Sequence, residues 1–204
     1  VEMMDGVEVI RYRYAAERWE TLVNDGGIVT NLRNNKWKLL LVPGFVLMQA
    51  LQAWRLSKSQ RIDVVHAHWL IPQGMIAALL HLLPGRKAPF VVTSHGADLF
   101  ALRGAALQSA KKFVLSRARS ATVVSSAMRD IVARMGADVG KVSVIPMGVD
   151  MVGRFVPSPS TQRSNTELLF VGRLVEKKGL SYLMEALPQV LKLMPATTLT
   201  IAGF

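Results

Sequence analysis

The sequence contains no cysteine, which excludes disulfide bonds, cysteine-ligated zinc and thiol nucleophiles. Acidic residues are also scarce: Asp and Glu number 14 against 25 Lys and Arg, which gives a formal net charge of +11. This imbalance predicts an anionic partner, which could be a nucleic acid, a phospholipid surface or a phosphorylated small molecule. Half of the residues are hydrophobic, so the chain can bury a core and is not disordered.

Long hydrophobic runs are missing as well. The longest run without a charged residue or a histidine, residues 39–54, is shorter than the roughly 20 residues of a spanning helix and is interrupted by Pro43 and Gly44, so no transmembrane helix is predicted. Basic residues border this run on both sides. This pattern has two interpretations: a core helix with solvated ends, or an interfacial helix on anionic lipid. The bordering cations are Arg33, Lys36, Lys38, Arg55, Lys58 and Arg61.

The hydrophobic pattern alternates between short β-rich runs and helical periodicity. The predicted strands are residues 6–11, 62–68, 90–94, 121–125, 142–147, 167–171 and 197–202. The predicted helices are residues 73–83, 105–117, 127–135 and 180–194. Near-continuous apolar strands favour a parallel sheet covered on both faces, so the predicted fold is α/β with a doubly wound, Rossmann-like sheet.

A stretch rich in Pro, Ser and Thr, VPSPSTQRSNT, is typical of a linker. It predicts a first domain over residues 1–150, a linker over 151–166 and the beginning of a second domain over 167–204. The chain begins with VEMMDG, without an initiator methionine or a signal sequence, which we interpret as an internal start.

Polar residues follow most of the predicted strands, at the edge where parallel sheets bind ligands. His68 and Trp69 follow one strand, and His95, Gly96 and Asp98 follow the next. His66 lies within its strand, and we expect it to be a buried, hydrogen-bonded imidazole. Ser125 is expected to cap the helix that follows it. No Asp or Glu accompanies the histidines at metal-ligand spacing, so no metal site is predicted.

The segment GRLVEKKGL joins a predicted strand to a predicted helix. Gly172 allows a close backbone approach, and the helix that begins near Gly179 offers free N–H groups and a positive dipole. Arg173 and Lys178 add full charges there, which suits a diphosphate. Solvated cations at a helix start are the alternative interpretation of the same pattern.

The order of the motifs resembles glycosyltransferase family 4, whose GT-B fold has two facing Rossmann-like domains. The motifs are DVVHAHWLIPQG, VVTSHGADLF, VVSSAMRDIV, VSVIPMGVD, LLFVGRLVEKKGL and LTIAGF. The resemblance implies a retaining transfer of a sugar from a nucleotide diphosphate sugar to an acceptor hydroxyl. It also implies that the first domain mainly binds the acceptor and that the second mainly binds the donor. Since Arg173 and Lys178 would stabilise the charge of the departing diphosphate, no metal or other cofactor is expected to be required.

The resemblance assigns roles to individual residues. The donor diphosphate is expected to contact Arg173 and Lys178, with Gly172 and Gly179 beside them, and His95 is expected to lie near the transferred sugar. The acceptor cleft is expected to include His68, Trp69, Gly96 and Asp98. Gly148 and Asp150 are expected to form the hinge, and Met147 stands where the family often has asparagine.

Two motifs of the family are absent from the sequence: the glycine-rich turn after its first strand, and the acidic Glu-x7-Glu motif. We therefore expect the chain to be a fragment that is inactive by itself. The resemblance predicts a cytoplasmic enzyme, at the membrane face if the acceptor is lipid-linked, in polysaccharide, lipopolysaccharide or glycolipid synthesis. Nucleic acid is not an expected partner. The alternatives are another GT-B enzyme, either a nucleotide-sugar epimerase or a sugar phosphorylase, and a basic, non-catalytic module that binds lipid or nucleic acid.

Overall fold

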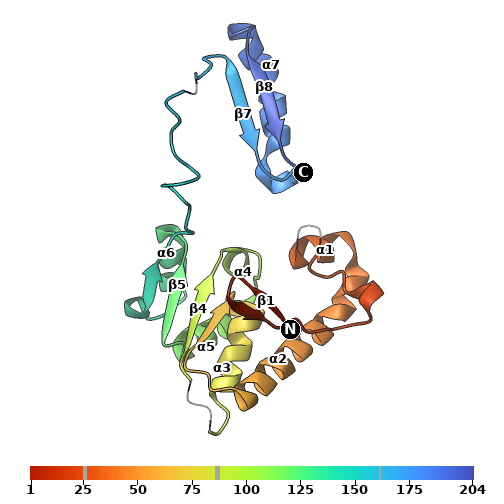
Figure 1. The fold of residues 1–204 in the computed structure, drawn as a ribbon, viewed down its shortest axis with the longest axis vertical. Helices are drawn as coiled ribbons and strands as arrows, with labels where there is room; N and C mark the ends of the chain where they lie inside the picture. Colours follow the sequence, from red (N-terminus) through yellow and green to blue (C-terminus); the bar gives the residue numbers. More distant parts are fainter. Residues whose placement is uncertain (25–26, 86–87, 161) are drawn as a thin grey trace. The chain divides into compact units, whose positions relative to one another are not determined.

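The computed structural model describes residues 1–24, 27–85, 88–160 and 162–204. The chain forms two compact units, Val1–Gly148 and Val149–Phe204 (Figure 1). A four-stranded parallel sheet is the centre of the first unit, and a two-stranded parallel sheet is the centre of the second.

The sheet of the first unit has the order β3-β4-β5-β6, with every neighbouring pair parallel. The strands are β3 (Val65–His68), β4 (Phe90–Ser94), β5 (Ser120–Val123) and β6 (Val142–Val144). The helices between them are α3 (Met75–His81), α4 (Ala97–Phe100), α5 (Ala105–Arg117) and α6 (Ser126–Arg134). This parallel, helix-connected sheet confirms the predicted Rossmann-like α/β fold class.

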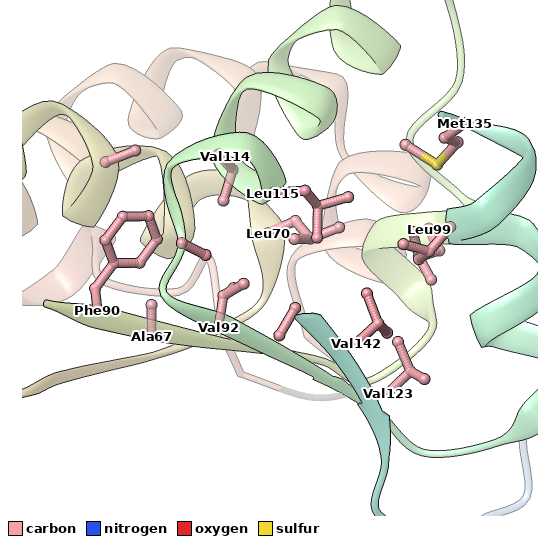
Figure 2. Close-up of a cluster of buried hydrophobic side chains, with 14 of the residues drawn as sticks. Ala67, Leu70, Phe90, Val92, Leu99, Val114, Leu115, Val123, Met135 and Val142 are labelled. Atoms are coloured by element: carbon pink, nitrogen blue, oxygen red, sulfur yellow. The ribbon is translucent and has the colours of Figure 1, made fainter. Parts of the chain in front are cut away.

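The main core lies on one face of this sheet. Apolar side chains of the four strands alternate toward it, because every second residue of a strand points to the same face. Ala67, Val92 and Val142 lie on this face and pack with Val114 of α5 (Figure 2). Val132 of α6 belongs to the same core. In the described residues no helix contributes to such a core on the other face, so the expected covering of both faces is seen on one face only.

The residues before the sheet differ most from the prediction. The single strand expected at residues 6–11 is an antiparallel hairpin of β1 (Glu2–Met4) and β2 (Val7–Val9). The elements that follow are η1 (Glu17–Trp19), α1 (Ile28–Asn34), η2 (Lys36–Leu40) and α2 (Leu41–Ser59). The helical segments η1 and α1, which lie before the apolar run, were not predicted.

The apolar run is not interrupted at Pro43. Proline breaks a helix when it lies in the interior, but Pro43 lies in the first turn of α2, where its missing N–H has no helical partner to lose. Because η2 ends where α2 begins, the two form the helical segment Lys36–Ser59, which by length and composition alone could cross a membrane. Only 11% of its apolar window is buried.

The second unit consists of a strand, a helix and a parallel strand. Its elements are β7 (Glu167–Val171), the short η5 (Glu176–Lys178), α7 (Leu180–Leu193) and β8 (Thr198–Ala202). The predicted strands at residues 167–171 and 197–202 are thus confirmed, the second beginning one residue later. No residue of α7 is buried.

Candidate functional site

A row of hydrogen-bonded polar side chains crosses the face of the first sheet that is opposite its main core. His66 of β3 contacts Thr93 of β4 through Nε2 and Oγ1, which lie 2.7 Å apart. The Thr93 hydroxyl lies 2.6 Å from the Thr122 hydroxyl of β5. These residues share a face because the parallel register places His68 beside Thr93 and Thr93 beside Thr122. The sequence did not single out the two threonines, since alternation in an apolar strand does not reveal which face is polar.

Three of the predicted site residues meet at the carboxyl ends of β3 and β4. His68 Nδ1 lies 2.9 Å from His95 Nε2, and the two rings stack with centroids 5.1 Å apart. The Trp69 ring lies 5.5 Å from the His95 ring. Trp69 has a positive φ of 80°, and its N–H donates to the Thr93 carbonyl oxygen at 2.7 Å. This backbone conformation turns the chain sharply at the end of β3 and leaves the indole partly exposed.

The histidine cluster disfavours positive charge. Desolvation of the ring by its surroundings and the neighbouring rings of His68 and His95 lower the pKa of His66 below its ordinary value of 6.5. His66 also lies 4.3 Å from the His68 ring, measured between centroids. The His68–His95 contact needs one nitrogen to donate and the other to accept, so both rings cannot be imidazolium while it persists. His66 is hydrogen-bonded as expected, but it is exposed on the sheet face and not buried.

Asp98 lies beneath this cluster and does not face solvent. Its side chain is 2% exposed, and both oxygens accept hydrogen bonds: Oδ2 from the Leu70 N–H and Oδ1 from the Ser94 hydroxyl, each at 2.7 Å. Leu70 directly follows Trp69, and Ser94 directly precedes His95. The carboxylate therefore ties together the two chain segments that carry the exposed rings.

The turn between His95 and Asp98 depends on Gly96. Gly96 has φ 102°, a conformation that a side chain strains, and it is the N-terminal cap of α4. At the other end of α4, the buried Lys111 ammonium donates to the Leu99 and Leu102 carbonyl oxygens at 3.2 and 2.6 Å. Burial lowers the pKa of Lys111, and the nearby Asp98 carboxylate opposes that shift. Lys111 thus holds the loop after α4, a role that its place in a helical pattern did not indicate.

The predicted cationic turn of the second unit lies between β7 and α7. Gly179 has φ 74° and caps the N-terminus of α7, so the tight turn occurs there. Gly172 needs no left-handed backbone, but a Cβ atom on it would lie 4.0 Å from Lys178 Cδ, so the lysine stem runs alongside it. Arg173 is half-buried and Lys178 is exposed. Neither has an ion-pair partner in the part of the chain that the structure describes.

The predicted hinge residues lie at the boundary of the two units, with Gly148 ending the first and Asp150 near the start of the second. The Asp150 carboxylate accepts from the Gly153 and Val152 N–H groups at 2.7 and 3.1 Å. These hydrogen bonds lower the pKa of Asp150. Ser125 caps α6 by accepting from the Met128 N–H, as predicted. Among the described residues no three His, Asp or Glu side chains form a group that could hold a metal ion.

Comparison with known proteins agrees with the geometry of the first unit. The model of Glycosyltransferase Family 4 matches residues 5–152. Glycogen synthase of Mycobacterium tuberculosis is 30% identical over 156 residues, which cover 72% of this chain and 37% of that protein. One of the subunits of phosphatidylinositol N-acetylglucosaminyltransferase from Arabidopsis thaliana is 30% identical over 152 residues, which cover 72% of this chain and 33% of that protein.

The chain therefore spans about a third of the length of these curated relatives. The matched region includes the whole parallel sheet of the first unit and the cluster at its carboxyl edge. A family match over that region, joined to the motifs at the ends of β3 and β4, leads to one conclusion: the chain belongs to glycosyltransferase family 4.

Proposed function

We propose that the protein transfers a sugar from a nucleotide diphosphate sugar to an acceptor hydroxyl, with retention of the anomeric configuration. Membership of family 4 implies a nucleotide-sugar donor and an acceptor. The observation that carries the proposal is the cluster of His68, His95 and Trp69 at the carboxyl ends of β3 and β4. Stacked imidazoles and a partly exposed indole offer hydrogen bonds and an apolar ring face, which match the hydroxyl groups and the C–H face of a sugar.

Arg173 and Lys178 bind the donor diphosphate in this proposal. Both are cations at the approach to the N-terminus of α7, where free N–H groups and the helix dipole also favour negative charge. The negative charge of the departing diphosphate grows as the glycosidic bond breaks. Fixed cations stabilise that charge more in the transition state than in the ground state, and this difference lowers the barrier.

His95 orients the transferred sugar by a hydrogen bond from its imidazole. Its partner His68 fixes the plane of that ring, since their two nitrogens are 2.9 Å apart. The role requires geometry more than a shifted pKa. Asp98 is a positioning residue, because its buried carboxylate contacts the backbone and Ser94 and leaves no free oxygen for a ligand.

The acceptor in this proposal is a carbohydrate or a lipid-linked molecule, and the pathway is polysaccharide, lipopolysaccharide or glycolipid synthesis on the cytoplasmic side of a membrane. One relative is named for glycogen and the other for phosphatidylinositol, so the names of the two relatives include both kinds of acceptor. The sugar and the nucleotide base of the donor are left open.

A donor panel tests the proposal. The full-length protein is incubated with several uridine, guanosine and adenosine diphosphate sugars, with and without carbohydrate and lipid-linked acceptors, and nucleoside diphosphate release is measured. We expect acceptor-dependent release with one donor and a product of retained configuration by NMR. Epimerised sugar without net transfer, or phosphate-dependent cleavage of a glycan, would instead assign one of the other GT-B activities. No turnover together with salt-sensitive DNA binding would favour a binding module.

A further inference from the structure

An apolar stripe runs along the outward side of α2. It consists of Leu40, Pro43, Leu47, Leu51 and Trp54, which recur at steps of three or four residues and so share one side of a helix. Leu40 is 81% and Leu47 66% exposed, whereas Leu51 and Trp54 at the far end of the stripe are partly exposed. Trp37 and Leu39 of the preceding turn, η2, are exposed as well. On the surface of a water-soluble protein such a contiguous set of exposed apolar residues is unusual, and it marks a contact with another apolar phase.

The packing beneath the stripe fixes its outward direction. Lys38 is buried, and its ammonium donates to the Thr21 carbonyl oxygen at 3.1 Å and to Asn31 Oδ1 at 2.5 Å. Lys38 therefore points inward and does not belong to the basic border in which the sequence placed it. On the next turn, Leu41 and Phe45 are buried with Leu22. These anchors leave the residues on the other side of the helix facing away from the unit.

The charge around the stripe has one sign. Between Asp25 and Asp63 the sequence has no acidic residue. Exposed cations lie near both ends of the stripe, at Arg33 and Lys36 before it and at Arg55 and Lys58 beside and after Trp54. The Lys58 ammonium lies 4.4 Å from the centroid of the Trp54 ring. Tryptophan and lysine are the residues that favour the boundary between lipid headgroups and acyl chains.

We propose that this side of α2, together with η2, binds the surface of an anionic phospholipid bilayer, with the helix lying in the plane of the interface. The inference deepens the proposed function, on which it rests for its acceptor: an enzyme held at the lipid surface meets lipid-linked substrates there. Apolar side chains supply the insertion, and the surrounding cations supply attraction to anionic headgroups.

The helix lies on the membrane and does not cross it. A crossing helix would expose its inward side to lipid, but the rings of Tyr12 and Tyr14 pack on Phe45 with centroids 5.8 and 5.4 Å away. Further along, Ala53 and Leu56 line an apolar cleft of about 280 Å³ that they share with β3, α3 and β4. Withdrawing α2 from these contacts would dismantle the small core around Leu22.

Vesicle flotation tests the proposal. The protein is mixed with vesicles of phosphatidylcholine alone or with about one third phosphatidylglycerol, at low and at physiological salt. We expect binding to the anionic vesicles that weakens as salt rises, and a blue shift of tryptophan emission that is reduced in Trp37→Phe. Leu40→Glu with Leu47→Glu should weaken binding roughly tenfold or more, since each leucine would lose its transfer into the apolar phase.

Matched controls carry the same changes elsewhere in the first unit. Val139→Glu replaces an exposed apolar residue in η4 (Val139–Lys141), and Lys112→Glu reverses an exposed charge on α5. Neither should alter vesicle binding, whereas Lys36→Glu and Lys58→Glu should weaken it and reduce its salt dependence. Made in the full-length protein, all variants should keep the wild-type turnover of donor with a water-soluble acceptor, which separates loss of membrane binding from failure of the proposed function.

Two results would overturn the proposal. One is the absence of binding to anionic vesicles at low salt by a folded protein. The other is a dimer in light scattering that Leu40→Glu and Leu47→Glu dissociate, with no vesicle binding by the monomer, since the stripe would then be an interface between copies of the chain.

Discussion

His68 and His95 face each other across two neighbouring strand ends, with Nδ1 of one ring 2.9 Å from Nε2 of the other and ring planes 17° apart. One of the two nitrogens must accept, so the pair holds its geometry only while at least one ring is neutral. We propose that this constraint orients His95 toward the transferred sugar, so that the two histidines act together.

Substitution of the two histidines should show that they act together. His95→Ala should lower kcat about 100-fold, because a hydrogen bond that positions the reacting sugar is lost. His68→Ala should lower it less, since His95 remains but is no longer held. The double variant should be about as slow as His95→Ala alone, as is typical of residues that act together. Steady-state kinetics on the three variants of the full-length protein make the comparison, and losses that simply multiply would contradict the account.

His66 should make folding stability depend on pH. Its pKa is lowered in the folded state, whereas the unfolded chain titrates near 6.5. Between the folded and the unfolded pKa the unfolded chain binds more protons, so stability falls as the pH falls below about 6.5 and is constant above it. Urea midpoints from pH 7.5 down to 5 should decrease, and His66→Gln should flatten the decrease. An unchanged pH dependence in that variant would mean that His66 does not supply the effect.

Asp98 should matter more for stability than an exposed carboxylate. Asp98→Ala leaves the Leu70 N–H and the Ser94 hydroxyl without their acceptor in a buried place, so unfolding free energy should fall by about 2 to 4 kcal/mol. Asp130, which is exposed on α6, provides the control, and its alanine variant should stay within about 0.5 kcal/mol of wild type. Urea denaturation measures both. Equal losses of unfolding free energy at the two positions would contradict the positioning role of Asp98.

The regular elements were predictable where local pattern and fold agree. β4, α5 and β7 were predicted with their observed bounds, because a short β-rich apolar run or a strong helical period is followed by a clear change of pattern. The early segment was harder. α1 has no acidic first turn and no side-chain cap, so nothing in its sequence marks where it begins. In α2 the effect of Pro43 depends on where the helix starts, which the pattern does not reveal.

The site was predictable as a set of motifs but not as a geometry. His68, Trp69 and His95 were assigned to one edge, and they do contact one another. Asp98 was assigned to the cleft with them, yet its side chain is buried, since sequence does not distinguish a carboxylate that binds a ligand from one that binds backbone N–H groups. Thr93 and Thr122 were missed because alternation in an apolar strand does not reveal which face of the sheet is polar.

Binding of the donor diphosphate is tested most directly by three alanine substitutions in the second unit. The sequence offers the neighbouring Lys177 as a control, but its side chain lies outside those that the structure describes, and Lys192, exposed in the last turn of α7, takes its place. If Arg173 and Lys178 bind the diphosphate, either substitution removes a contact that strengthens as the leaving group gains charge.

The measurement is kcat/KM for the nucleotide-sugar donor in the full-length protein, as wild type and as Arg173→Ala, Lys178→Ala and Lys192→Ala, with thermal melts to establish that all are folded. The account predicts that each of the first two loses roughly 2 to 4 kcal/mol of transition-state stabilisation, about 30- to 1,000-fold, while Lys192→Ala stays near wild type. Equal small losses at all three positions would contradict it, because they would mean a general attraction of anions and no specific contact with the diphosphate.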